Sequence, residues 1–157
     1  MKINLIVVGK TKSKFLVEGE KVYSERLKHY CKFTEFIIPD VKNSGKLSTL
    51  ELKHKEGEGI LSAIDNRAEV ILLDENGSSF SSIMFSKFLN KKILSSNKEL
   101  VFVVGGAFGF SDQVYKRSNS KLSLSKMTFS HQMIRLFFKE QLYRSLTILK
   151  GEKYHHE

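Results

Sequence analysis

Short apolar runs recur along the chain, and a turn follows each of them. Residues 3–8 form a run rich in β-branched side chains that ends at Gly9, and similar runs cover residues 33–39, 70–74 and 100–104. Continuous runs of this kind are typical of strands that are buried on both faces, as in a parallel sheet. We therefore predict that these runs are the strands of a mostly parallel sheet.

Amphipathic segments with helical spacing lie between and after these runs. The longest starts near Ser130, buries side chains such as Phe138 and Leu142, and stops at Gly151. The other predicted helices cover residues 15–29, 50–66 and 111–118 and a segment through Ile83, Phe85, Phe88 and Leu89. Because strands and helices alternate without a linker or repeat, we predict one α/β domain over residues 1–157, with helices flanking the sheet.

The charge balance narrows the class of partner. The 157 residues include 26 Lys and Arg against 17 Asp and Glu, which gives a formal charge of +9 and a pI near 9.6. Such a surface attracts polyanions, for example nucleic acid or an anionic membrane face. Ordinary solubility is the alternative explanation of the same charge. Composition therefore indicates a partner class and no activity.

The cysteine count and the N-terminal sequence indicate the cellular compartment of the protein. The single cysteine, Cys31, excludes an intramolecular disulfide and leaves too few thiolates for a structural zinc site. A reducing compartment fits this composition best. The apolar N-terminal run is too short for a signal peptide or a membrane-spanning helix. We therefore expect a cytoplasmic protein with no metal ion and no membrane partner.

Three loops are candidates for one ligand pocket: residues 73–77, 105–110 and 122–129. In open α/β sheets, ligands bind outside the carboxyl ends of the strands. Gly105, Gly106 and Gly109 let the backbone approach a ligand closely, which suits a nucleoside or its ribose. A tight strand-to-helix turn explains the same glycines, because their spacing does not match the dinucleotide-binding fingerprint.

The serine-rich loop also has two explanations. Ser123, Ser125 and Thr128 have hydroxyls that can bind a polar ligand or cap the helix that follows. The apolar residues that alternate with them could form a slot for a flat ring; they are Leu122, Leu124, Met127 and Phe129.

Residues on and after the last helix are candidates for substrate binding and catalysis. Arg135 and Arg144 can pair with phosphate through a planar fork, Tyr154 can stack on a base, and His155 can move a proton near neutral pH. Further histidines are His131, before the helix, and His156. The alternative for the arginines is a surface or intersubunit ion pair, and for His131 a structural role beside a helix cap.

Motifs along essentially the whole chain resemble one family. The run LSLSKMTFSHQMIRLFFKEQLYRSLTILKGEKYHHE is similar to the C-terminal signature of the ribosomal RNA large subunit methyltransferase H family, a small branch of the SPOUT methyltransferases. The segments MKINLIVVGKTK, LLDENGSSFSS and FVVGGAFGFSDQV resemble its first strand, its central strand and turn, and its glycine loop. The resemblance implies a SPOUT-type α/β domain with a C-terminal trefoil knot.

The resemblance also implies a cofactor and its site. The cofactor is S-adenosyl-L-methionine, the methyl donor, and the matching positions are Leu73, Gly105, Leu124, Ser125, Lys126, Met127, Thr128 and Phe129. Two positions depart from the family pattern. Ser130 stands where the family often has proline, which affects the exit of the loop, and Ala107 with Phe108 replaces smaller or polar residues of the pocket wall.

The implied reaction is methylation of N3 of a pseudouridine in 23S rRNA, on the assembled ribosome. His155 is expected to assist proton removal, while Tyr154 and Arg135 place the target. The family acts as a homodimer in which the partner's C-terminal tail completes each site. A ribosome- or RNA-binding module of the same fold without methyl transfer is the alternative. A small-molecule nucleotide-binding enzyme is disfavoured, since neither a Walker motif nor a dinucleotide fingerprint is present.

Overall fold

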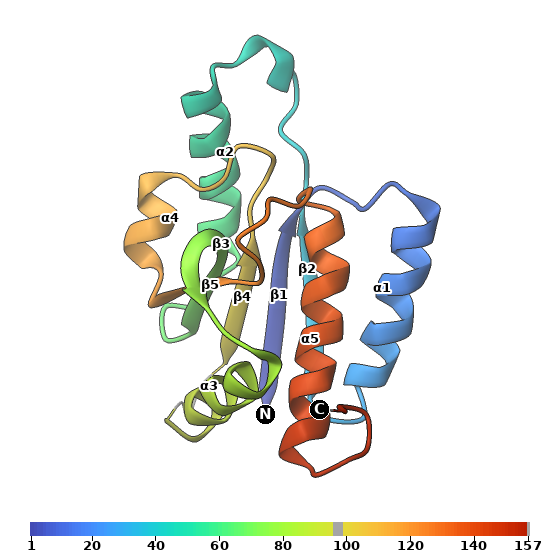
Figure 1. The fold of residues 1–157 in the computed structure, drawn as a ribbon. Coiled ribbons are helices and arrows are strands. Elements are labelled where there is room, and N and C mark those ends of the chain that lie inside the picture. The colour runs from blue at the N-terminus through green and yellow to red at the C-terminus, as the bar shows by residue number, and fades with distance from the viewer. Residues whose placement is uncertain (96–98, 157) are drawn as a thin grey trace.

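The protein, in a computed structural model that describes residues 1–95 and 99–156, is built on one parallel sheet. Within these residues the five strands have the order β2-β1-β4-β3-β5 (Figure 1). The strands are β1 (Lys2–Val8), β2 (Lys32–Ile38), β3 (Glu69–Ser79), β4 (Leu100–Val104) and β5 (Ser120–Ser123). The helices are α1 (Lys14–Leu27), η1 (Ser44–Lys46), α2 (Thr49–Ser62), α3 (Ser82–Ser95), α4 (Asp112–Arg117) and α5 (Met133–Leu149).

Helices cover both faces of the sheet. The helices α1, α3 and α5 lie on one face, and α2 and α4 lie on the other (Figure 1). Alternate side chains of β1 belong to the two cores: Ile3, Leu5 and Val7 pack with the first group of helices, and Ile6 and Val8 pack with the second. The central strands β1 and β4 are therefore buried on both sides, which is the physical reason for their continuous apolar sequence. The predicted α/β class and the predicted strands and helices are confirmed; the trefoil knot stays a prediction.

The prediction was wrong about the segment after residue 73. The loop expected at residues 73–77 is part of a strand, because β3 continues to Ser79, and Ser78 and Ser79 pair with Leu122 and Ser123 of β5 after a shift of register. The strand β5 was not expected, because its sequence is short and polar. Gly77 permits the close approach, since a Cβ there would lie 2.7 Å from the backbone nitrogen of Leu122.

The last helix, α5, packs the C-terminal part of the chain against the N-terminal helix α1. It lies between α1 and α3 and buries Phe138, whose ring centroid is 4.7 Å from that of Phe102 in β4. The buried ammonium of Lys139 lies 2.8 Å from a carboxylate oxygen of Glu20 in α1 and pairs with Glu35 of β2. These contacts fix the position of α5 and of the loop that leads into it. No helix among the described residues is long and apolar enough to cross a membrane.

Candidate active site

The three loops expected to meet do so at the carboxyl edge of the sheet. Residues 73–77 lie within β3, residues 105–110 follow β4, and residues 122–129 start at the end of β5; together they line a pocket of about 670 Å³. All but one of the residues expected to bind the cofactor line this pocket: Leu73, Gly105, Leu124, Ser125, Met127, Thr128 and Phe129. The exception is Lys126, whose side chain is exposed beside it.

The glycine loop forms one wall of the pocket. A Cβ on Gly105 would lie 3.1 Å from the ring of Phe110 and 3.3 Å from the carbonyl oxygen of Gly109, so the backbone here is already in close contact. Gly109 has a φ of +82° and donates its N–H to the carbonyl of Gly106 at 3.1 Å. The glycines therefore make a tight turn, and the same turn holds bare backbone against the pocket.

Two hydroxyl groups of the serine-rich loop form hydrogen bonds within the loop itself. Ser123 donates to the carbonyl of Ser125 at 2.8 Å, and the hydroxyl of Ser125 accepts from the N–H of Met127 at 2.9 Å. These serines do not cap α5. The hydroxyl of Ser130 accepts from the N–H of Met133, the first residue of α5, at 3.1 Å, so the serine that replaces proline makes a hydrogen bond at the start of the helix.

Two carboxylates that the sequence analysis had not selected lie at the pocket. The hydroxyl of Thr128 donates to Glu75 at 2.8 Å and so connects the serine-rich loop to β3. The hydroxyl of Tyr115 donates to Asp74 at 2.6 Å, and burial together with this bond raises the pKa of Tyr115 to about 12. The available signal was their position at the carboxyl end of the predicted strand 70–74, where Asp74 is the last residue and Glu75 the next.

His131 lies on the same pocket, before the first turn of α5. Burial lowers the pKa of this imidazole, the positive charges of Arg135 and Lys12 lower it further, and Asp40 acts in the opposite direction. At neutral pH the pocket therefore contains a neutral imidazole.

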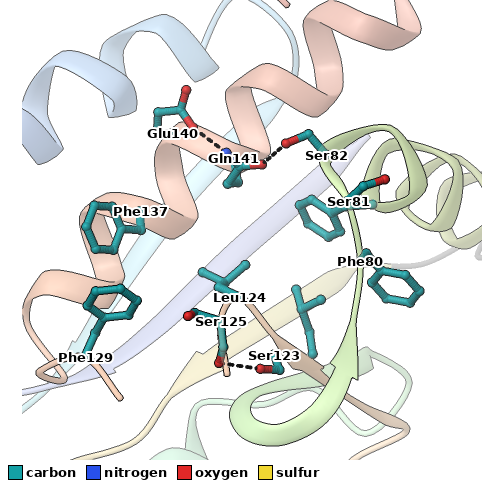
Figure 2. A pocket seen from close by; sticks show the side chains of 12 residues that line it. Phe80, Ser81, Ser82, Ser123, Leu124, Ser125, Phe129, Phe137, Glu140 and Gln141 are labelled. Atoms are coloured by element: carbon teal, nitrogen blue, oxygen red, sulfur yellow. Dashed lines mark hydrogen bonds between the residues drawn. The ribbon is translucent and has the colours of Figure 1, made fainter. Parts of the chain in front are cut away.

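A second hollow of about 460 Å³, shown in Figure 2, adjoins the first and shares Leu122, Leu124, Ser125 and Phe129 with it. Ser82 donates to the amide oxygen of Gln141 at 2.8 Å, and Gln141 donates to Glu140 at 2.8 Å. The exposed ring of Phe137 meets Phe129 edge-on at 5.0 Å between centroids. This aromatic groove leads from the pocket along α5 to Glu140.

Beyond Glu140 lies the C-terminal tail. Tyr154 donates to Glu140 at 3.1 Å, and its ring packs edge-on against Tyr143 at 4.7 Å. The guanidinium of Arg144 lies 4.8 Å from the centre of the Tyr154 ring and 3.2 Å from Nδ1 of His155. Burial raises the pKa of Tyr154, with its bonds to Tyr23 and Glu140 adding to the effect. In the same chain, neither Tyr154 nor His155 lines the pocket.

Arg135 lies apart from both groups, beneath the surface. Its side chain is fully buried, and it donates to the carbonyls of Val8 at 2.6 Å and of Gly9 at 2.8 Å. It also donates to the hydroxyl of Thr11 at 3.2 Å and to the carbonyl of His131 at 3.1 Å. The guanidinium therefore contacts the loop after β1 and the start of α5, and it does not line the pocket.

Comparisons with known proteins agree with this architecture. A chain from Christiangramia forsetii called ribosomal RNA large subunit methyltransferase H is 56% identical over 156 residues, covering 99% of each chain. A protein of the same name from Flavobacterium psychrophilum is 57% identical over all of both chains. Among solved structures, a probable methylase family protein from Haemophilus influenzae Rd KW20 superposes with a TM-score of 0.51 at 10% identity, covering 99% of this chain and 70% of that one.

The family assignment rests on the whole chain. The family described as predicted SPOUT methyltransferases matches residues 1–155, which span every strand and helix of the fold. The two relatives are 56% and 57% identical to it, over 99% and 100% of its length. The parallel sheet, the pocket at its carboxyl edge and the matched sequence thus lead to one conclusion: the chain belongs to the SPOUT methyltransferase family.

Proposed function

We propose that the protein transfers a methyl group from S-adenosyl-L-methionine to N3 of a pseudouridine in 23S rRNA, within the assembled ribosome in the cytoplasm. The observation that carries the proposal is the pocket itself, where residues 73–77 of β3 meet the loops 105–110 and 122–129. The name shared by the full-length relatives supports an rRNA substrate. The net charge of +9 supports it as well, since rRNA is a polyanion.

The residues of the pocket fit the proposed cofactor. Leu73, Leu124 and Phe129 offer apolar surface for the adenine ring, and the backbone at Gly105 allows close approach. Met127, with Ser125 and Thr128, would complete the wall, and Lys126 would lie at its outer edge. The carboxylates of Asp74 and Glu75 suit a ligand that carries positive charge. Bound there, S-adenosylmethionine would supply an electrophilic methyl group on its sulfonium sulfur.

The protein then has to orient the acceptor and take one proton from N3. Positioning contributes most in such a transfer, because the nucleophile must approach in line with the bond that breaks. We assign proton acceptance to His155 and placement of the base to the ring of Tyr154. Arg135 was expected to place the target directly. Its burial instead favours a positioning role through the loop that it holds.

We further propose that the active form is a homodimer in which the tail of one chain completes the pocket of the other. Tyr154 and His155 lie outside the pocket of their own chain, which supports completion in trans. The aromatic groove that leads from the pocket toward the tail is lined by partly exposed aromatic side chains: Phe80, Phe129 and Phe137. Such side chains are suited to burial in an interface.

The direct test is methyl transfer from labelled S-adenosylmethionine to ribosomes from cells that lack this protein, with stripped rRNA as a parallel substrate. We expect incorporation into assembled ribosomes alone, and nucleoside analysis should give N3-methylpseudouridine. Cofactor binding without incorporation would reject the substrate. Tight ribosome binding without cofactor binding would instead favour the alternative, an RNA-binding module of the same fold.

Completion in trans has its own test. A Gly105→Val chain should lack a usable cofactor pocket but keep an intact tail, whereas a His155→Ala chain has the opposite defect. Mixing the two after partial unfolding and refolding should restore methyl transfer that neither has alone, because one mixed site then combines a sound pocket with a sound tail. Failure to restore activity, with dimers present, would place the tail's function within its own chain.

A further inference from the structure

Two neighbouring loops at the carboxyl edge of the sheet carry exposed lysines that no role in the pocket explains. One loop follows β1, and the other, residues 39–48, follows β2. Because β1 and β2 pair in parallel, the loops leave the same edge of the sheet (Figure 1). The exposed side chains are Lys10 and Lys12 on the first loop and Lys42 and Lys46 on the second. None of the four forms an ion pair with a described residue.

The loop after β1 is held in one position by buried contacts. Arg135 donates to the carbonyls of Val8 and Gly9 and to the hydroxyl of Thr11. The backbone N–H of Lys12 donates to the amide oxygen of Gln132 at 2.9 Å. Only the backbone of Lys12 is used in this bond, so its ammonium remains available. A lysine whose backbone is already fixed loses less conformational freedom when it binds than one on an unanchored loop.

The second loop is connected to the first. Gly9 donates its N–H to the carbonyl of Ile38, the last residue of β2, at 2.8 Å. A Cβ on Gly9 would lie 2.5 Å from a carboxylate oxygen of Asp40, so the two loops touch at this point. Asp40 is the single acidic residue of residues 9–14 and 39–48. The lysines therefore form one basic surface, which we call the lysine edge.

The lysine edge begins at the rim of the pocket. Gln132, which holds Lys12, directly follows His131, and His131 lines the pocket. On the pocket itself the acidic side chains are Asp74 and Glu75, which belong to β3. A positively charged ligand is thus favoured within the pocket, and a polyanion is favoured at its rim.

We propose that the lysine edge binds the phosphate backbone of the rRNA strand on which the target nucleotide lies. This inference rests on the proposed function, since a nucleotide that enters the pocket brings its flanking phosphates to the rim. Lysine acts toward phosphate as a point charge without base specificity, so the contact would give orientation and affinity and would leave base selection to the pocket. Arg135 holds the loop that carries Lys10 and Lys12, and it would therefore position these lysines for the contact.

The test compares two double variants of the full chain. Lys10→Ala with Lys12→Ala removes two charges of the lysine edge without deleting a side-chain hydrogen bond. Lys87→Ala with Lys91→Ala removes two exposed charges from α3 and is the matched control. Binding to ribosomes is measured from low to moderate salt, together with cofactor binding and the melting temperature.

We expect the first variant to bind ribosomes about tenfold more weakly at low salt, and the slope of log K against log salt to fall by about 1.4–1.8. Its cofactor affinity and melting temperature should match those of the native chain, and the control should bind ribosomes normally. A second variant, Lys42→Ala with Lys46→Ala, should shift the slope in the same direction.

Equal ribosome binding and equal salt slopes in all variants would overturn the proposal, even if native protein methylates rRNA. A loss of the same size in the control would also overturn it, because the effect would then reflect net charge alone. If native protein transfers no methyl group but loses ribosome binding on substitution of Lys10 and Lys12, the proposed activity fails and the lysine edge stands as an RNA contact.

Discussion

The guanidinium of Arg135, on the first turn of α5, donates a 2.6 Å hydrogen bond to the carbonyl oxygen of Val8, the last residue of β1. The bond joins segments that are 127 positions apart in the sequence. It also places a permanently charged side chain, fully buried, among carbonyl oxygens at the carboxyl edge of the sheet. One residue of the last helix thereby determines where the first loop of the chain lies.

Replacing Arg135 by alanine should therefore destabilise the fold. The change leaves the carbonyls of Val8 and Gly9 buried without this donor, and we expect a loss of about 2–5 kcal/mol in the free energy of unfolding. Arg67→Ala is the control, because that side chain is 82% exposed, and it should change stability by less than about 0.5 kcal/mol. Denaturant unfolding measures both. Equal unfolding midpoints for the Arg135 variant and the native chain would show that the bonds contribute nothing.

The glycine loop gives a prediction about cofactor binding. Valine in place of Gly105 should abolish binding of S-adenosylmethionine in calorimetry, because even a Cβ would lie 3.1 Å from the ring of Phe110. Gly45→Ala is the matched glycine control, since a Cβ there would meet nothing within 4 Å, and it should bind normally. Retained affinity in the Gly105 variant would remove this loop from the cofactor site.

The bond between Thr128 and Glu75 should contribute to the same affinity. Thr128→Val keeps the shape of the side chain but removes the donor of the 2.8 Å bond that closes the loop onto β3. We expect the dissociation constant for S-adenosylmethionine to rise by about three- to tenfold, which corresponds to roughly 0.5–1.5 kcal/mol. Glu75→Gln retains an acceptor oxygen for this bond, so the dissociation constant of that variant should rise less. An unchanged constant in the valine variant would mean that the loop is held by its other contacts.

Adjacent histidines at the C-terminus allow a matched comparison of turnover. His155 is partly buried beside Arg144, whereas His156 is exposed. We expect His155→Ala to lower kcat for ribosome methylation by about 10²–10⁴-fold while leaving cofactor affinity unchanged, as for loss of a general base. His156→Ala should have little effect on either quantity. Full turnover without His155 would assign proton acceptance to another group.

His131 should make stability depend on pH. Burial and the charges of Arg135 and Lys12 lower the pKa of His131 in the folded state, so between the ordinary value of 6.5 and the lowered one the unfolded chain binds more protons. The stability that comes from the neutral imidazole is present above pH 6.5 and is lost as the pH falls through the lowered pKa.

His131→Gln should therefore flatten the fall of the unfolding free energy on the acid side of pH 6.5. Unfolding curves of the variant and the native chain across this range test it, and NMR titration of the imidazole gives the pKa directly. A pKa above 6.5, or parallel stability profiles, would contradict the prediction.

The sequence by itself was sufficient for the α/β class, for β1, β2 and β4, and for the helices, because continuous apolar runs and helical periodicity report burial locally. The same rule missed β5, since its short sequence Ser120–Ser123 carries no such signal and its pairing is with residues 71–73 and 78–79 of β3, about 45 positions earlier in the chain. Local pattern therefore predicted the layers and the edge strand β2, but not the opposite edge strand β5.

For the candidate site, sequence motifs were sufficient to select the three loops, and the fold brings them together around one pocket. Only the tertiary structure decided that Arg135 holds a loop, that Glu75 accepts a hydrogen bond from Thr128, and that Tyr154 and His155 lie away from the pocket of their own chain. The physical reason is common to all of these: each depends on contacts between residues far apart in the chain, and side-chain type alone does not specify which distant groups will meet.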